Sequence, residues 1–511
     1  MEDDAMTRSS PARAKNMTFA LAAGKLGTLR ILQIAASAAA FLVVVGGIIP
    51  SGYANTGVLG IPIAFVLVGM VLLVFCVGYN AMSRQITNAG ALYAFISAGL
   101  GPKAGVAAAY VAWLAYNFFQ VSAYGLAGAV AQSLLNPLLG VNWAWWAYAA
   151  GCCGLVAVLG LLKIEMNASV LGVLMLAEVT LIIVFAVAGL THPAGGVISL
   201  TTLSPHALHG GGIWPALIIA ITGYTGFEGA AYYAEEARDR ERTVPAATYL
   251  CVVVSMAVYA VSAWALSVAA GPDQIVRRSG ADGDGSELVF NLAGTILGPA
   301  FASVGHVLLL TSVFAAALSF HNSVARYAFA LGREGVVPRW FGTVTARSCA
   351  PLWGSLTQSM IGAVVIAGFA IGGGDPVNDL FYKLGTTGGF GVLALLALTS
   401  AAIAAYFLKR DAGNWWRGVI APAVSAVLLT IAGAGALWYF PMLLGVEPNS
   451  PWRWILPGLL LFVGLVGLVR AVVLSKTNTD VYARIGRGSA TSSTPSPIGA
   501  LLARVDSEDF R

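Results

Sequence analysis

The chain has 511 residues, of which 58% are hydrophobic and only 10% are charged, and its formal net charge is +5. Soluble domains carry about 25% charged residues, so this composition excludes an ordinary globular protein and indicates a polytopic membrane protein. The first charged residues, Glu2, Asp3 and Asp4, are acidic, whereas a secretory signal begins with basic residues. We therefore expect no cleaved signal.

Apolar runs of roughly 20 residues are long enough to cross a bilayer as helices. The sequence predicts an all-α fold with about twelve such spans, near residues 30–49, 58–79, 104–134, 142–161, 166–190, 213–234, 247–271, 298–330, 352–373, 382–408, 417–440 and 453–475. The segments at both ends, residues 1–25 and 477–511, are polar and contain low-complexity sequence. Such composition predicts disordered tails.

The distribution of lysine and arginine predicts the orientation. With the N-terminus inside, only Arg277, Arg278, Lys383 and Arg453 of the 28 basic residues fall in outer loops, and Arg326 falls within a span. Positive residues near spans tend to remain in the cytoplasm. We therefore expect a multi-pass protein of the plasma membrane with both termini in the cytoplasm. The net charge reflects this bias and not nucleic-acid binding.

The first and sixth spans contain interrupted hydrophobic segments, FLVVVGGIIPSG at residues 41–52 and ITGYTGFEGA at residues 221–230. Five spans separate their starts, so the second unit would begin on the opposite side of the membrane. That arithmetic predicts an inverted repeat. Helices 1–5 (residues 26–190) and helices 6–10 (residues 191–410) would form the two repeats, and helices 11–12 (residues 411–476) would be appended.

The interruption in the sixth span is the strongest candidate for a substrate site. Unpaired backbone groups cannot face lipid, so they must line protein or a watery cavity. We expect the substrate to be bound by Gly223, Tyr224, Thr225, Gly226 and Phe227. Glu228 follows at a depth where a carboxylate is costly, and it is either a gate or proton carrier or a structural partner of the broken backbone.

Two further titratable residues lie within spans. Glu178 lies near the middle of the fifth span without a charged neighbour in the sequence, so it either couples transport to protons or a cation or is a buried neutral acid. His321 in the eighth span either titrates near neutral pH or packs as a satisfied core residue. Sodium coupling through the hydroxyls of Thr311, Ser312 and Ser319 is the weaker alternative, because such groups usually bond their own backbone.

Polar residues elsewhere suggest contacts between helices. Asn117 and Gln120 in the third span suit either substrate binding or interhelical hydrogen bonds. Arg326 is close enough to the inner mouth to form a gating salt bridge with Glu235 or Glu236, or else it extends toward the interface. No metal site or cofactor is expected, since the five cysteines have neither a disulfide nor a zinc setting, and no catalytic motif predicts an enzyme.

The sixth span contains Gly226-Phe227-Glu228 followed by Ala234-Glu235-Glu236, Arg242 and Pro245, and the eighth span contains Asn322, Arg326 and GREGVVP. These two patterns resemble the amino acid–polyamine–organocation permease superfamily, and the likeness covers roughly residues 26–475. The resemblance implies a leucine-transporter-like fold in which substrate is bound between spans 1, 3, 6, 8 and 10.

The resemblance also implies roles for particular residues. Relatives commonly have a glycine-rich GxG at the break of the first span, where the substrate carboxylate binds, and this chain has Ser37, Ala38, Ala39 and Ala40 in the aligned stretch. Proton-coupled relatives often have a lysine in the fifth span, where this chain has Glu178.

The leading hypothesis is therefore a secondary transporter that works by alternating access. Its expected substrate is an amino acid or a related amine, with the proton as coupling ion or with exchange, and membrane lipid surrounds it. The first alternative is transport of a polyamine or an inorganic cation, which Glu178 and Glu228 would favour. A transporter-like membrane sensor is more remote, because no signalling domain is visible in the sequence.

Overall fold

The computed structural model describes residues 17–18, 21–210, 212–281, 287–410 and 413–487, and most of them are helical. Within these ranges, ten helical segments are long and apolar enough to cross a membrane. The two remaining expected spans are the 16-residue helix α7 (Trp145–Gly160) and the sixth span. The sixth span is divided into α9 (Ile213–Gly223) and the 3₁₀-helix η5 (Phe227–Tyr233). The all-α polytopic membrane fold is confirmed.

The first span is also divided. It consists of α1 (Thr28–Ala39), α2 (Phe41–Val43), the π-helix η2 (Val44–Ile48) and α3 (Ile49–Thr56). The other long spans are α4 (Ile61–Gln85), α6 (Pro102–Leu139), α8 (Ile164–Thr191), α10 (Arg240–Ala270), α13 (Pro299–Glu334), α14 (Leu352–Gly372), η7 (Pro376–Leu384) with α15 (Gly385–Leu408), η8 (Trp416–Ile420) with α16 (Ala421–Trp438), and α18 (Trp452–Thr477).

Short elements occupy the connections. They are β1 (Met17–Thr18), α5 (Leu92–Leu100), η3 (Thr201–Leu203), η4 (Pro205–Ala207), α11 (Ile275–Ala281), α12 (Leu288–Leu297), η6 (Arg339–Gly342), β2 (Val344–Thr345), α17 (Phe440–Leu443) and α19 (Thr479–Arg484). Strands β1 and β2 form one short antiparallel pair, in which Met17 is opposite Thr345.

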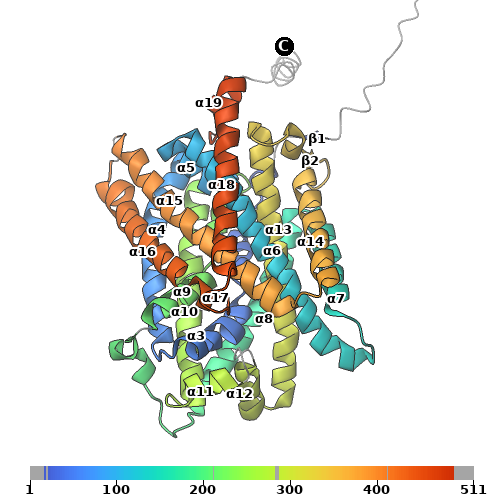
Figure 1. The fold of residues 1–511 in the computed structure, drawn as a ribbon, viewed down its shortest axis with the longest axis vertical. Helices are drawn as coiled ribbons and strands as arrows, with labels where there is room; N and C mark the ends of the chain where they lie inside the picture. The colour runs from blue at the N-terminus through green and yellow to red at the C-terminus, as the bar shows by residue number, and fades with distance from the viewer. Residues whose placement is uncertain (1–16, 19–20, 211, 282–286, 411–412, 488–511) are drawn as a thin grey trace, which may run out of the picture.

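One local pattern occurs twice. Both α6 and α13 begin at a proline that follows a glycine, Gly101 with φ 97° and Gly298 with φ 96°. Positive φ favours glycine, and proline is preorganised for the first turn of a helix. Each pair follows a short helix, α5 or α12, and Figure 1 shows these two short helices at opposite ends of the molecule. We call these ends the α19 end, which carries α5, and the α12 end.

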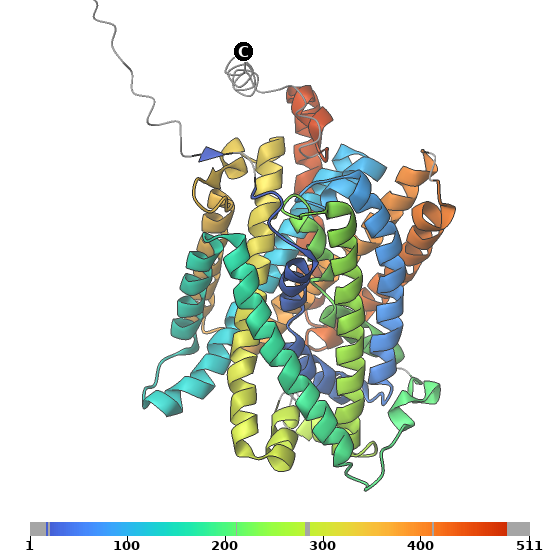
Figure 2. The ribbon, with the colours of Figure 1, turned by 180° about the vertical axis from the view of Figure 1, so that it is seen from behind.

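The first and last described elements both lie at the α19 end (Figures 1 and 2). Here the hydroxyl of Ser97 donates to the carbonyl of Ile485 over 3.3 Å, and the N–H of Gly486 donates to Glu334 over 2.7 Å. The described parts of both expected tails are thus packed on the helical body, because their backbone groups find partners there.

The two divided spans lie at the centre of the molecule. The first span packs against α8, α10 and α13, and α1 also contacts η5 of the sixth span. Figure 2 shows the first span running between α10 and α13. Helix α6 supports this centre from the other side through contacts with α13, α15 and η7. Both interruptions are therefore enclosed by protein, as unpaired backbone in a membrane requires.

Candidate functional site

The interruptions of the first and sixth spans touch each other. Helix α1 ends at Ala39, and the next residue, Ala40, adopts a left-handed conformation with φ 47°. In the sixth span, Gly226 has φ 118°, and a Cβ atom added there would lie 2.7 Å from the Cβ atom of Ala38. Both the backbone angle and the close approach require glycine at position 226. The break in the first span lies just before the segment 41–52 in which the sequence suggested it, since Gly46 and Gly47 continue as π-helix.

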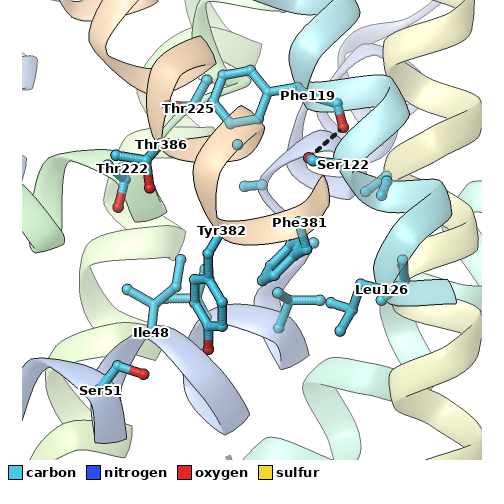
Figure 3. A pocket seen from close by; sticks show the side chains of 18 of the residues that line it. Ile48, Ser51, Phe119, Ser122, Leu126, Thr222, Thr225, Phe381, Tyr382 and Thr386 are labelled. Carbon is cyan, nitrogen blue, oxygen red and sulfur yellow. Dashed lines mark hydrogen bonds between the residues drawn. The ribbon is translucent and has the colours of Figure 1, made fainter. Parts of the chain in front are cut away.

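A cavity of about 160 Å³ lies beside these two breaks, bounded also by α6, α13 and η7 (Figure 3). The described residues that line it carry no charged side chain. They are Ala38, Ala39, Ala40, Val43, Val44, Ile48, Ser51, Asn55, Phe119, Ser122, Ala123, Leu126, Ile219, Thr222, Thr225, Val313, Ala316, Phe320, Phe381, Tyr382, Gly385, Thr386, Met442 and Leu443. We call this space the central cavity. It combines apolar walls with a few hydroxyl groups, which is typical of small-molecule sites.

Two residues that line the central cavity, Asn55 on α3 and Met442 on α17, belong to elements that lie toward the α12 end in Figure 1. Along α13, the lining residues are followed toward the α19 end by two arginines that form ion pairs. Arg326 forms hydrogen bonds of 2.6 and 2.9 Å with Glu236, and Arg333 forms hydrogen bonds of 2.8 and 2.6 Å with Glu235. The sequence predicted that Arg326 pairs with Glu235 or Glu236. In the structure it pairs with Glu236, and Glu235 pairs with Arg333.

Glu228 is fully buried and does not line the central cavity. Its carboxylate accepts a hydrogen bond of 2.7 Å from the hydroxyl of Tyr116 and one of 3.0 Å from the N–H of Gly226. It lines a separate small cavity of about 10 Å³ together with Gly226, Ala38 and Phe320. Glu228 therefore holds the broken backbone and also connects the sixth span to α6.

Glu178 lies at the junction of α8, α13 and the first span, and it is 3% exposed. The hydroxyl of Ser312 donates to its carboxylate over 2.7 Å, and the backbone of Leu42 also hydrogen-bonds to it. Leu42 is the second residue after the break at Ala40, where N–H groups lack partners within the helix. The carboxyl group of Glu178 is therefore in contact with the backbone of the broken first span.

Asn117, Gln120 and His321 lie behind the cavity wall and do not line the central cavity. Gln358 on α14 donates to Asn117 over 2.9 Å, and Gln120 donates to Tyr124 over 2.7 Å and to Nδ1 of His321 over 3.1 Å. His321 also contacts Ser355 through Nε2 at 2.7 Å. An amide nitrogen only donates, so Nδ1 of His321 carries no proton here. These residues form interhelical hydrogen bonds, which was one of the two roles that their sequence positions allowed.

Several other expected substrate residues also point elsewhere. The hydroxyl of Ser37 lies 3.5 Å from the carbonyl of Leu171, and the hydroxyl of Tyr224 donates to the carbonyl of Phe65 over 2.6 Å. Phe227 packs edge-to-face on Phe75. Gly223 packs against Val44 and Phe65 and does not itself line the central cavity. Of the eleven residues that the sequence suggested for substrate binding, only Ala38, Ala39, Ala40 and Thr225 line the central cavity.

The sequence did not indicate the largest side chains of the central cavity, Phe119, Phe320, Phe381 and Tyr382. Phe119 and Phe320 stack with ring centroids 5.0 Å apart and form the wall between α6 and α13. Figure 3 shows Phe381 and Tyr382 on η7, at the side of the cavity toward Leu126 and Ile48. Aromatic residues within apolar spans are common, so only the packing of α6 against α13 and η7 distinguishes these four.

A multi-pass membrane protein in which two interrupted helices meet at an internal cavity has the architecture of a secondary transporter. Residues 26–465 match the model of the amino acid permease family, so the chain belongs to this family. The family resemblance seen in the sequence is thereby confirmed. Family membership also identifies the protein as a permease rather than an enzyme.

The chain is also similar to individual proteins, at low sequence identity. The chain is similar to the low-affinity putrescine importer PlaP of Escherichia coli strain K12, with 24% identity over 74% of this chain and 80% of that protein. It is similar to the branched-chain amino acid permease BcaP of Lactococcus lactis, with 26% identity over 61% of this chain and 68% of that protein. It is also similar to the uncharacterized amino acid permease YvbW of Bacillus subtilis, with 23% identity over 64% of this chain and 72% of that protein.

Proposed function

We propose that the protein transports a neutral α-amino acid with an apolar side chain across the plasma membrane by alternating access, with the proton as coupling ion. The observation that carries this proposal is the central cavity, whose lining residues in the described chain include no charged side chain. An apolar side chain suits the walls formed by Phe119, Phe320 and Phe381. A substrate with a charged side chain would lose its hydration there without gaining a partner.

The charged head group of an amino acid would be held by backbone at the two breaks. The carbonyl groups at the end of α1 suit an ammonium group, and the N–H groups at the start of the half-helix 41–56 suit a carboxylate. Ala38, Ala39 and Ala40 bring this backbone to the cavity surface because their side chains are small. Thr225 supplies a hydroxyl group from the opposite break.

We assign the α19 end to the cytoplasm, so that this conformation is closed to the inside. The prediction that basic residues stay inside supports this assignment, and the first and last described elements lie together at that end. The opposite placement of α5–α6 and α12–α13 supports two inverted repeats at residues 26–190 and 191–410. Inward opening then requires the Arg326–Glu236 and Arg333–Glu235 pairs to separate.

Polyamine transport is the second candidate, and the similarity to a putrescine importer favours it. A diamine, however, needs anionic partners, and neither Glu178 nor Glu228 lines the central cavity. Both carboxylates already accept hydrogen bonds within the protein, Glu178 from Ser312 and Glu228 from Tyr116. An inorganic cation faces the same difficulty.

Uptake into proteoliposomes tests the two candidates against each other. Purified protein is reconstituted, an inward-directed proton gradient is imposed, and uptake of radiolabelled L-leucine and of putrescine is measured against protein-free vesicles. We expect leucine to accumulate above its equilibrium level, and we expect a protonophore to abolish the accumulation. Accumulation of putrescine without leucine uptake would establish the second candidate and refute the first.

A further inference from the structure

A second cavity of about 190 Å³ adjoins the central cavity toward the α12 end. We call it the outer cavity. It is lined by Val43, Gly46, Gly47, Leu126, Ala129, Val130, Ser133, Glu287, Phe290, His306, Leu309, Val377, Phe381 and Tyr382. Val43, Leu126, Phe381 and Tyr382 line both cavities, so these four side chains form the partition between them.

The outer cavity differs from the central cavity in carrying one acid and one base. Nε2 of His306 lies 3.2 Å from the carboxylate of Glu287. The side chains of Glu287 and His306 are 54% and 31% exposed, so both are accessible to a solute from the α12 end. Nδ1 of His306 lies 2.9 Å from the carbonyl of Ala302. Because both ring nitrogens face acceptors, this geometry fits an imidazolium beside a carboxylate.

The imidazole ring of His306 is held in place by its neighbours. The ring of Phe290 packs on that of His306 with centroids 4.3 Å apart. Phe290 in turn occupies space left by two glycines, since a Cβ atom on Gly305 would lie 2.8 Å from its ring and one on Gly46 would lie 3.5 Å from it. The base is therefore positioned before any ligand arrives, which lowers the entropic cost of binding, and Glu287 is paired with it.

We propose that the outer cavity is a second binding site that receives the zwitterionic head group of an amino acid before it passes the partition. The ammonium group binds at the carboxylate of Glu287, and the carboxylate binds at the imidazolium of His306. The substrate side chain lies against Phe381 and Tyr382, which also line the central cavity. This inference rests on the proposed function, because it assumes an amino acid as substrate.

The charge pattern of the outer cavity selects this class of ligand. A diamine would meet an imidazolium beside its carboxylate partner, and that like charge is unfavourable. A zwitterion matches both charges at once. When the Glu287–His306 ion pair separates, the ammonium group of the zwitterion can pair with Glu287 and its carboxylate can pair with His306. The outer cavity would thus concentrate zwitterions at the partition, while the uncharged central cavity would select by the shape of the side chain.

Binding stoichiometry tests this proposal. Equilibrium binding of radiolabelled L-leucine to the purified full-length protein is measured up to concentrations far above the KM for uptake. We expect two leucine molecules per wild-type protein and one for Glu287→Gln and for His306→Gln. We also expect the KM for uptake to rise about fivefold in Glu287→Gln while kcat is unchanged, because the lost interaction is partly exposed.

Asp273→Asn provides the matched control, because Asp273 is an exposed acid in the same interhelical connection and lines neither cavity. This variant should bind two leucine molecules. Two molecules bound to Glu287→Gln, or only one bound to the wild type, would overturn the proposal of an outer site. If the folded wild-type protein binds no neutral amino acid at all, the proposed function itself fails. That outcome differs from the two outcomes that overturn only the outer site, because in each of them leucine still binds.

Discussion

Arg326 and Glu236 form a bidentate ion pair in which their side chains are only 3% and 1% exposed. The pair connects α13 to the segment that follows η5. The same segment is connected to the start of the chain, because the carbonyl of Glu236 accepts the N–H groups of Lys25 and Leu26 at 2.9 and 3.0 Å. Under the proposed mechanism, three segments that would separate on inward opening therefore converge on Glu236.

Removing one partner of this ion pair should destabilise the protein strongly. Arg326→Ala leaves the carboxylate of Glu236 buried without its cation, and such a loss costs about 3–5 kcal/mol. Arg242→Ala is the control, because the Arg242–Asp239 pair is 3.9 Å long and its side chains are 91% and 55% exposed. A surface pair of this kind contributes at most about 1 kcal/mol. Chemical unfolding of both variants in the same detergent gives the comparison.

The double variant Arg326→Met with Glu236→Met separates the charge effect from the packing effect. It leaves no unpaired charge, so it should be more stable than Arg326→Ala. If Arg326→Ala is no less stable than Arg242→Ala, the pair does not hold the closed state.

The close contact between the two breaks predicts different outcomes at two neighbouring glycines. Gly226→Ala must place a side chain at φ 118° and 2.7 Å from the Cβ atom of Ala38, whereas a Cβ atom at Gly229 would lie no closer than 3.8 Å to a neighbour. We expect Gly226→Ala to cost about 1–3 kcal/mol from backbone strain alone, and to weaken leucine binding.

Gly229→Ala should leave leucine binding close to that of the wild type. Titration calorimetry on monodisperse protein measures both variants. Equal affinities in Gly226→Ala and Gly229→Ala would show that the contact between the breaks does not shape the site.

Glu178 should couple uptake to the driving ion because it contacts the first span directly after its break. Glu178→Gln keeps a similar shape and mimics the protonated acid. We expect this variant to lose accumulation against a gradient while it retains exchange of leucine across the membrane. Ser312→Ala is the control, because it removes the hydrogen bond of 2.7 Å to Glu178 but preserves the carboxyl group. This control should still accumulate leucine.

Accumulation and exchange are measured separately in proteoliposomes. Equal loss of both activities in Glu178→Gln would assign Glu178 a structural role instead.

The sequence predicted the features that depend on burial in lipid. Continuous apolar runs and isolated acids have few alternatives in a membrane, so the spans and the burial of Glu228 could be inferred from the sequence. Arg326 could be matched to two neighbouring acids by helical rise alone. The sequence could not show that Arg326 pairs with Glu236 and not with Glu235. That choice depends on the orientation of the segment after η5, which the periodicity of a regular helix does not specify.

The sequence could not predict which face of α6 lines the central cavity. Buried residues lie all around α6, so its pattern does not distinguish the face with Phe119 and Ser122 from the face with Asn117 and Gln120. Polarity suggested the second face, but its amides are satisfied by Gln358 and by other neighbouring side chains. Leu-Gly-Pro occurs at residues 100–102 and again at residues 297–299. This recurrence supports the proposed inverted repeat only when it is combined with the positions of α5 and α12 at opposite ends of the molecule.

Protection of a reporter cysteine tests the central claim most directly. Ser122 lines the central cavity, and its hydroxyl donates to the carbonyl of Phe119 in the same helix over 2.9 Å. Ser122→Cys is conservative because it replaces one oxygen atom by sulfur. In a background without the five native cysteines, a membrane-impermeant thiol reagent added outside should modify this cysteine, and saturating L-leucine should slow the reaction at least about tenfold. Asp273→Cys should react at the same rate with or without leucine. Modification of Ser122→Cys that leucine does not slow would contradict the placement of the substrate in this cavity.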